Sequence, residues 1–246
     1  MKSLLSAFTR ILPLAFTLTA AALVSACGGA SREPAPTKGT PPEAARSAPA
    51  AATPAESVPK IVAFGDSLTA GYGLTPQESY PALLQKMLDA DGFRYEVVNA
   101  GESGGTSAGG VRRLDWALDA GNVRFLILEL GANDFLRGQP VAETRKNLAE
   151  IIRRSKARGA RVLLAGMYTT TESGNEYAIQ IRDAFQSLAA EHEVPLIPFF
   201  LEGVAGIDRL NQEDRIHPNA EGTRIVAATV YRHLKPLLEK DGRGGE

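Results

Sequence analysis

The sequence predicts an α/β domain in which helices cover both faces of a parallel β-sheet. Continuously apolar runs of four to seven residues recur along the chain, as expected for strands that are buried on both faces. Segments with the apolar spacing of amphipathic helices lie between these runs. The alternation extends over about 180 residues, which is a normal size for one α/β domain.

The predicted elements can be placed in order along the chain. The first apolar run, Lys60–Phe64, ends at Gly65, and the fifth run is the weakest of the set. In the first predicted helix, Leu84 and Leu88 lie on one apolar stripe. The strands are expected at residues 60–64, 95–98, 124–130, 161–165 and 194–197, and the helices at 79–90, 141–158, 176–191 and 219–239.

The amino-terminal 26 residues have the features of a secretory signal peptide. Lys2 and Arg10 come before an apolar run of sixteen residues, 11–26. A membrane-spanning helix needs about 20 apolar residues, so this run is short for a membrane span. The sequence Val-Ser-Ala-Cys that ends at Cys27 resembles a bacterial lipobox, in which the cysteine becomes the lipidated first residue of the mature chain. We therefore expect an exported lipoprotein that faces the periplasm, and Gly28 favours the outer membrane. The alternative is an ordinary signal peptide with a chance cysteine near its end.

The next segment predicts a tether. Residues 27–59 follow the signal peptide and contain seven of the 15 prolines. They cannot bury enough apolar surface to offset the entropy lost on ordering, so we expect an extended, disordered chain. The folded domain is expected at 60–240, and a disordered tail at 241–246.

Composition excludes several classes of function. The chain of 246 residues has 27 basic and 28 acidic side chains, and this balance argues against nucleic-acid binding as the main role. One cysteine excludes an internal disulfide framework and a multi-cysteine zinc site. Only three histidines are present. We expect no metal and no organic cofactor.

Four polar segments are the candidates for chemistry, because ligands bind such sheets beyond the carboxyl ends of the strands. Ser67 follows the first strand at a strand-to-helix turn, where its hydroxyl can face solvent, although Asp and Ser are also common helix caps. Residues 99–105 form a glycine-containing loop that lets a backbone N–H approach a substrate closely. Asn133 follows the third strand, where its amide can donate to an oxyanion or cap a helix.

The fourth segment combines a carboxylate with an imidazole. Asp214 and His217 are three residues apart, so the carboxylate can pair with Nδ1 and leave Nε2 free as a base. A surface histidine with no catalytic role is the alternative. The other two histidines have poorer contexts: His192 lies between two glutamates, and His233 lies on the charged face of the last helix.

Taken together, the four segments resemble those of the SGNH hydrolases, also called GDSL lipases/esterases. The resemblance extends from about Ile61 to about Leu238 and is strongest to the bacterial thioesterase I/lysophospholipase/arylesterase branch. The strings that carry it are FGDSLTAGYG, NAGESGGTSAGG, LELGANDFLRG, VPLIPFF and DRIHPN. The resemblance implies a flavodoxin-like three-layer α/β/α sandwich with a five-stranded parallel sheet.

The resemblance also implies a role for each matching residue. Ser67 is the expected nucleophile, and Asp214 and His217 are the expected acid and base. The backbones of Ser67 and Gly104 and the side chain of Asn133 are the expected oxyanion hole. The implied function is a serine esterase that hydrolyses acyl esters, thioesters or lysophospholipids without a cofactor.

The loop after the fourth strand is expected to form a wall of the acyl pocket, with Tyr168 and Tyr177 near it. It carries Thr169 to Thr171 where many relatives have prolines, so the acyl preference of relatives does not transfer directly. The expected partners are small acyl esters or lipids, and Cys27 is the only expected contact with a membrane. Two alternatives are an O-deacetylase of cell-envelope carbohydrate and a non-enzymatic flavodoxin-like binding module. The binding-module alternative lacks support, because the sequence contains neither of the two glycine-rich motifs that bind phosphate groups, G-x-G-x-x-G and G-x-x-x-x-G-K-S/T.

Overall fold

The computed structural model describes residues 57–167 and 176–242. Its centre is one sheet of five parallel strands in the order β2-β1-β3-β4-β5, which is the flavodoxin-like order. This confirms the predicted α/β class and the number of strands. The strands are β1 (Lys60–Gly65), β2 (Glu96–Gly101), β3 (Val123–Glu129), β4 (Arg161–Ala165) and β5 (Leu196–Ile197).

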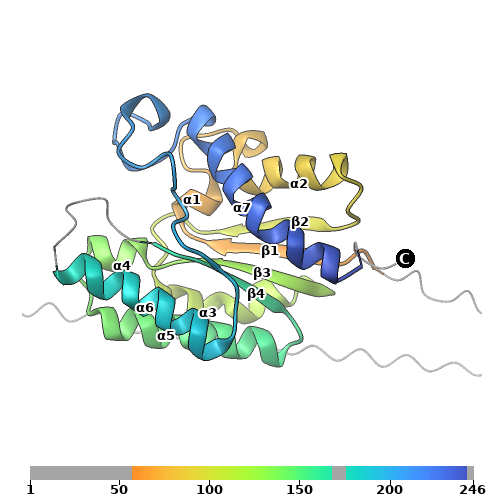
Figure 1. The fold of residues 1–246 in the computed structure, drawn as a ribbon, viewed down its shortest axis with the longest axis horizontal. Helices are drawn as coiled ribbons and strands as arrows, with labels where there is room; N and C mark the ends of the chain where they lie inside the picture. Colours follow the sequence, from red (N-terminus) through yellow and green to blue (C-terminus); the bar gives the residue numbers. More distant parts are fainter. Residues whose placement is uncertain (1–56, 168–175, 243–246) are drawn as a thin grey trace, which may run out of the picture. The chain divides into compact units, whose positions relative to one another are not determined.

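Helices cover both faces of the sheet and complete three layers. In Figure 1, α2 and α7 lie on one face, and α3, α5 and α6 lie on the other. The helices are α1 (Ser67–Ala70), α2 (Tyr80–Ala90), α3 (Ser107–Leu118), α4 (Ala132–Leu136), α5 (Val141–Ala157), α6 (Glu176–His192) and α7 (Ala220–Lys240). Two short 3₁₀ helices, η1 (Pro76–Glu78) and η2 (Asp208–Leu210), lie in the connecting loops.

The core forms where the predicted apolar runs meet the apolar stripes of the helices. β1 is a central strand, and helices cover both faces of the sheet from which its side chains project, so residues 61–64 have no exposed surface. On the outer layer, α5 buries Leu148, Ile151 and Ile152, while its charged residues face solvent. The side chain of Asn219 caps the start of α7 by accepting from the Glu221 and Gly222 N–H groups.

The sequence analysis missed α3. Two adjacent glycines, Gly109 and Gly110, lower the helix propensity of this segment and hide its periodicity. The side chain of Thr106 caps the helix by accepting from Gly109 N, and Leu114 is fully buried beneath it. Gly110 permits close packing, because a Cβ there would lie 2.4 Å from Cδ1 of Leu130.

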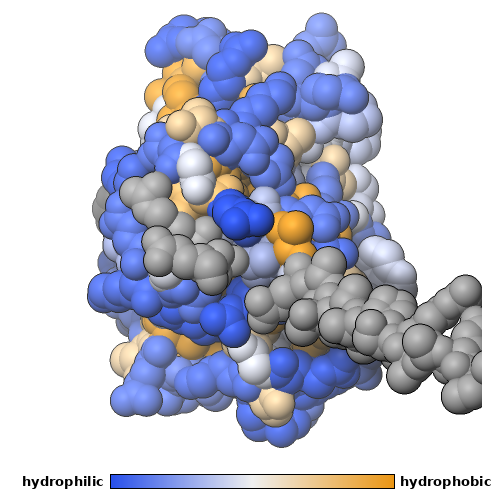
Figure 2. Space-filling view, turned by 90° about the vertical axis from the view of Figure 1, so that its right-hand side faces the viewer, coloured by the Kyte–Doolittle hydropathy of each residue, from blue (hydrophilic) through white to orange (hydrophobic). Residues whose placement is uncertain are grey.

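The described chain begins and ends at the amino-terminal end of the sheet. The side chain of Asn122 donates to the Ser57 carbonyl beside the start of β1. Asp241, which the sequence analysis assigned to the tail, accepts from Tyr95 Oη at 2.7 Å and from Arg124 Nη2 at 3.2 Å. This end faces the viewer in Figure 2, where hydrophilic residues predominate and hydrophobic ones are scattered. Within residues 57–167 and 176–242, no helix is long and apolar enough to cross a membrane.

Candidate active site

The predicted polar segments meet at the carboxyl end of the sheet. Ser67 is the first residue of α1, which follows β1 directly. Asp66 caps this turn, because its Oδ1 accepts from Leu68 N at 3.0 Å. Gly65 is needed for the close approach of the turn to β3, since a Cβ at this position would lie 2.3 Å from Glu129 Oε2. The tight turn therefore presents the Ser67 hydroxyl at the edge of the sheet.

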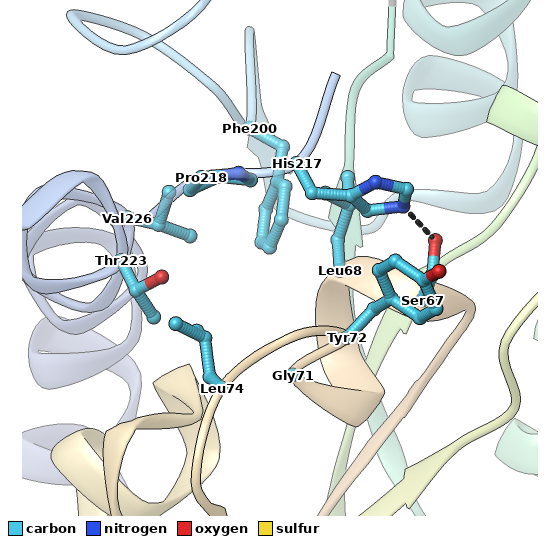
Figure 3. Close-up of a pocket in the computed structure, with 10 residues that line it drawn as sticks. All are labelled: Ser67, Leu68, Gly71, Tyr72, Leu74, Phe200, His217, Pro218, Thr223 and Val226. Carbon is cyan, nitrogen blue, oxygen red and sulfur yellow. Dashed lines mark hydrogen bonds between the residues drawn. The ribbon is translucent and has the colours of Figure 1, made fainter. Parts of the chain in front are cut away.

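Ser67, His217 and Asp214 form a continuous chain of hydrogen bonds. The Ser67 Oγ lies 2.9 Å from His217 Nε2, as drawn in Figure 3. The His217 Nδ1 lies 2.6 Å from Asp214 Oδ2. A hydroxyl, an imidazole and a carboxylate in this order can transfer a proton from the hydroxyl and stabilise the imidazolium that results. The structure thus brings together the three residues that the sequence analysis named.

The loop before α7 holds the carboxylate in place. The second oxygen of Asp214, Oδ1, accepts from Ile216 N at 2.9 Å and from His217 N at 3.0 Å. Arg215, between them, has a φ of 60°, so the loop turns through the left-handed region. Hydrogen bonds lower the pKa of Asp214 to about 2, the largest contribution coming from the His217 N–H. The carboxylate is therefore ionised beside the imidazole at neutral pH.

The three expected oxyanion donors come after β1, β2 and β3, at the carboxyl end of the sheet. Gly104 has a φ of 77°, and its carbonyl accepts from Arg137 Nη2 at 3.0 Å. Among the described residues, nothing accepts from the N–H groups of Ser67 and Gly104, whereas Gly105 N donates to the Glu102 carbonyl. The Gly104 N–H is therefore open to another acceptor, whereas the Gly105 N–H is already engaged.

A buried carboxyl pair orients the third donor. Asn133 Nδ2 donates to Asp66 Oδ2 at 3.0 Å, which leaves its second N–H for another acceptor. Behind Asp66, Glu129 Oε2 accepts from Asp66 N at 3.1 Å and from Thr69 Oγ1 at 2.7 Å. Burial raises the pKa of Asp66 to about 6 and raises that of Glu129 well above its usual range, and the Asp66 charge raises that of Glu129 further. The sequence analysis gave neither residue this role.

Asp134 was also missed. Its carboxylate accepts from Ser107 N at 2.8 Å, from Ser107 Oγ at 2.6 Å and from Thr144 Oγ1 at 3.3 Å. It thereby ties the start of α3, just after Gly104, to the helix that carries Asn133. Its place next to Asn133 is the only signal that the sequence gives for this role.

A small pocket opens beside Ser67 and His217. Its walls are mainly apolar, and Leu74 and Val226 face Ser67 and His217 across it in Figure 3. The remaining lining residues are Leu68, Gly71, Tyr72, Phe200, Pro218 and Thr223. No group of three or more potential metal ligands occurs in the part of the chain that the structure describes.

The structure describes only one of the two tyrosines expected near the acyl pocket. Tyr177 lies at the start of α6 and donates its hydroxyl to the Gln139 carbonyl at 3.0 Å. Its ring meets that of Phe135, two residues after Asn133, at 6.3 Å. It is not among the residues that line the small pocket. Tyr168 and Cys27 lie outside the described residues.

An α/β sheet with serine, histidine and aspartate linked at its carboxyl end is an arrangement that serine hydrolases use. The chain belongs to the GDSL-like Lipase/Acylhydrolase family, whose model matches residues 63–225. It is therefore a carboxylic ester hydrolase.

Individual relatives agree with this assignment. The chain is 40% identical over 178 residues to esterase TesA of Pseudomonas aeruginosa, covering 72% of this chain and 89% of that protein. It is 35% identical over 181 residues to thioesterase 1/protease 1/lysophospholipase L1 of Escherichia coli, covering 74% and 86% respectively. The crystal structure of psychrotrophic esterase EstA from Pseudoalteromonas sp., inhibited by monoethylphosphonate, matches with a TM-score of 0.69 at 34% identity, covering 73% of this chain and 98% of EstA.

Proposed function

We propose that Ser67, His217 and Asp214 are the catalytic triad of an esterase for acyl esters, acyl thioesters or lysophospholipids. The observation that carries the proposal is the linked pair of short contacts, 2.9 Å from Ser67 Oγ to His217 Nε2 and 2.6 Å from Nδ1 to Asp214. The names of the relatives, which include an esterase and a thioesterase/lysophospholipase, support the substrate class.

The first half of the proposed reaction acylates the serine. His217 Nε2 takes the hydroxyl proton as Ser67 Oγ forms a bond to the acyl carbon, and the carbonyl π electrons move to oxygen. Asp214 stabilises the imidazolium through Nδ1. The tetrahedral species then collapses, the alcohol or thiol leaves with the proton from Nε2, and an acyl-enzyme remains. Water repeats the sequence and releases the carboxylic acid.

The proposed oxyanion hole consists of the N–H groups of Ser67 and Gly104 and the Asn133 amide. The two backbone donors have no acceptor among the described residues, so they are available to a developing negative charge. The Asn133 amide is held by Asp66 at 3.0 Å, so little reorganisation is needed when the charge forms.

The proposed location of the enzyme is the periplasmic side of the outer membrane. In this proposal residues 1–26 are removed, lipidated Cys27 anchors the chain, and residues 27–59 tether the domain at 60–240. The support is the lipobox-like sequence before Cys27. Cys27→Ser should abolish incorporation of radiolabelled palmitate and release the protein from the membrane fraction. Equal labelling of the variant and the wild type would contradict the anchor.

The triad is tested with Ser67→Ala on p-nitrophenyl esters from acetyl to palmitoyl. The variant should lose activity by several orders of magnitude. Ser187→Ala is the matched control, because Ser187 lies on α6 and its hydroxyl donates to the Ala184 carbonyl. Activity that persists in Ser67→Ala would refute the triad. A wild type that accepts acetate alone would instead favour an O-deacetylase.

The oxyanion donor is tested separately. Asn133→Ala should lower kcat about 10²- to 10³-fold, as found for the loss of one preorganised donor. KM should change little, because the interaction strengthens only in the transition state. A change in kcat below about threefold would assign Asn133 to a structural role in α4.

A further inference from the structure

An exposed aromatic residue borders the site. Tyr72 lies in the loop between α1 and η1 and is 54% exposed. Its N–H donates to the Ser67 carbonyl at 3.0 Å, so its backbone is tied to the proposed nucleophile. Gly71 and Gly73 flank it with φ of 80° and 74°, and these left-handed turns direct the ring.

The ring of Tyr72 lies against the imidazole of His217. The two ring centroids are 4.7 Å apart and the planes are tilted by 41°. In Figure 3 the Tyr72 ring stands beside both Ser67 and His217. Among the described residues, no group forms a hydrogen bond with the Tyr72 hydroxyl, and Gln212 reaches only the Tyr72 backbone carbonyl. The contact with His217 therefore depends on the ring alone.

Gln212 fixes the separation of the two rings. Its side-chain Nε2 donates to the Tyr72 carbonyl at 2.7 Å and to the Pro218 carbonyl at 3.0 Å. Its own backbone N–H donates to the His217 carbonyl at 2.8 Å. Gly73 allows this approach, because a Cβ there would lie 2.1 Å from Gln212 Oε1. One side chain thus joins the loop of Tyr72 to the loop of His217.

We infer that Tyr72 is a positioning residue for His217, whose ring it holds in line with Ser67 and whose protonated form it stabilises. The inference rests on the proposed function, in which His217 carries a positive charge in both transition states. The π face of a tyrosine attracts a cation within about 6 Å of its centroid, and the two rings lie inside that limit. The neutral imidazole gains less from this attraction, so the effect belongs to the transition state.

The test compares Tyr72→Phe with Tyr72→Leu in the full chain, using p-nitrophenyl acetate. Phenylalanine keeps the π face and loses a hydroxyl with no partner among the described residues, so kcat should stay within about twofold of wild type. Leucine fills similar space without a π face, so kcat should fall about three- to thirtyfold. KM should be unchanged, because the acetyl group is too short to need a side wall.

Trp116→Leu is the matched control for loss of an exposed aromatic. Trp116 lies on α3, is 68% exposed, and is nine residues beyond the start of that helix at Ser107. This substitution should leave kcat and KM as in the wild type. Equal unfolding temperatures of Tyr72→Leu and Tyr72→Phe would show that both variants are folded.

A second readout does not depend on turnover. The imidazole proton resonances of His217 should show a ring-current shift in the wild type and in Tyr72→Phe that disappears in Tyr72→Leu. The inference is overturned if leucine keeps wild-type kcat, if phenylalanine loses as much as leucine, or if the loss appears only in KM. Failure of the proposed function would look different, because Ser67→Ala would then remain active while the ring-current shift persisted.

Discussion

Glu129 is fully buried beneath the proposed active site, yet only one of its two oxygens has a hydrogen-bond partner among the described residues. A charged carboxylate there would face the carboxylate of Asp66 in a site that has almost no exposed surface. Burial and that neighbouring charge raise the pKa of Glu129, so the folded protein retains the proton at a pH where the unfolded chain loses it. Arg113, Tyr80 and His217 are the other titratable groups that act on the pair.

The sign of the pH dependence follows from this raised pKa. The stabilisation from Glu129 is complete at low pH and declines as pH rises above the ordinary glutamate value of 4.5. The glutamine in Glu129→Gln does not titrate. The free energy of unfolding of the variant should therefore increase relative to that of the wild type between pH 4.5 and 8. Urea unfolding at several pH values measures the difference, in which titrating groups remote from Glu129 cancel, whereas Asp66 titrates together with Glu129 as one coupled pair. Parallel profiles for the two proteins would show that Glu129 is ionised in the folded state.

At the residue scale, the sequence predicted groups that a local motif exposes and missed groups that act across the fold. Ser67, Asn133 and the pair Asp214 and His217 follow strands or precede a helix, so their positions could be inferred. Glu129 ends an apolar strand and is 63 residues from Asp66, to which it is bonded. Tyr72 meets a histidine 145 positions further along. Contacts over such separations depend on the completed fold.

At the element scale, α3 shows how two neighbouring glycines can differ in role. Gly109 is partly exposed, and a Cβ there would meet Thr106 Oγ1 only at 3.5 Å, an ordinary contact. Gly110 is buried, and a Cβ there would also lie 3.1 Å from Ile151 Cδ1 on α5. The first glycine weakens the helix, whereas the second permits its packing.

These roles predict that substitutions at the two glycines change the free energy of unfolding in opposite directions. Gly109→Ala should raise the free energy of unfolding by about 0.5–1 kcal/mol, because alanine has the higher helix propensity. Gly110→Leu should lower it by about 1–3 kcal/mol, because the extra volume must displace packed side chains. Denaturant unfolding of both variants measures the two changes. A gain in stability for Gly110→Leu would contradict the close packing of α3.

The elements that were predicted are those with a clear apolar period. The strands and the helices α2, α5, α6 and α7 were predicted to within a few residues, although β2 extends to Gly101 and so includes Asn99, which was predicted to lie in a loop. The short helices α1 and α4 were not assigned as elements, because four or five residues carry no period. Their formation depends on the turns that follow β1 and β3.

At the scale of the whole molecule, the two ends of the sheet have different tasks. The carboxyl end carries the polar side chains proposed for catalysis. The amino end is closed by Asp241, whose side chain is 11% exposed and accepts from Tyr95, Arg124 and Arg161. Tyr95 is buried against Phe125 of the core, so this carboxylate completes the hydrogen bonding of a core residue.

Asp241→Ala should lower the free energy of unfolding by about 1–3 kcal/mol, because the Tyr95 hydroxyl loses a charged acceptor. It should leave kcat unchanged, since the residue lies at the opposite end of the sheet from Ser67. Arg124→Ala is the control, and its change should be below about 0.5 kcal/mol, because that arginine is half exposed. A large loss of kcat in folded Asp241→Ala would show that the two ends are coupled.

The alternation of strands and helices predicted a parallel sheet covered on both faces, and the family resemblance implied its flavodoxin-like form. The path of the chain at its two ends could not be predicted in this way. Asp241 looked like part of a polar tail, because the sequence gives no sign of the tyrosine 146 positions earlier that it binds.

Ser57 accepts a hydrogen bond from Asn122, and Asp241 accepts one from Arg124. Both described ends of the chain therefore lie at the start of β3. A short peptide could therefore join them, and the chain could be opened instead at Gly159, an exposed turn with space around it. In such a circular permutant, His217 would come before Ser67 in the sequence. The order of the motifs along the chain would then differ from that of the family while the arrangement of the side chains in space stayed the same.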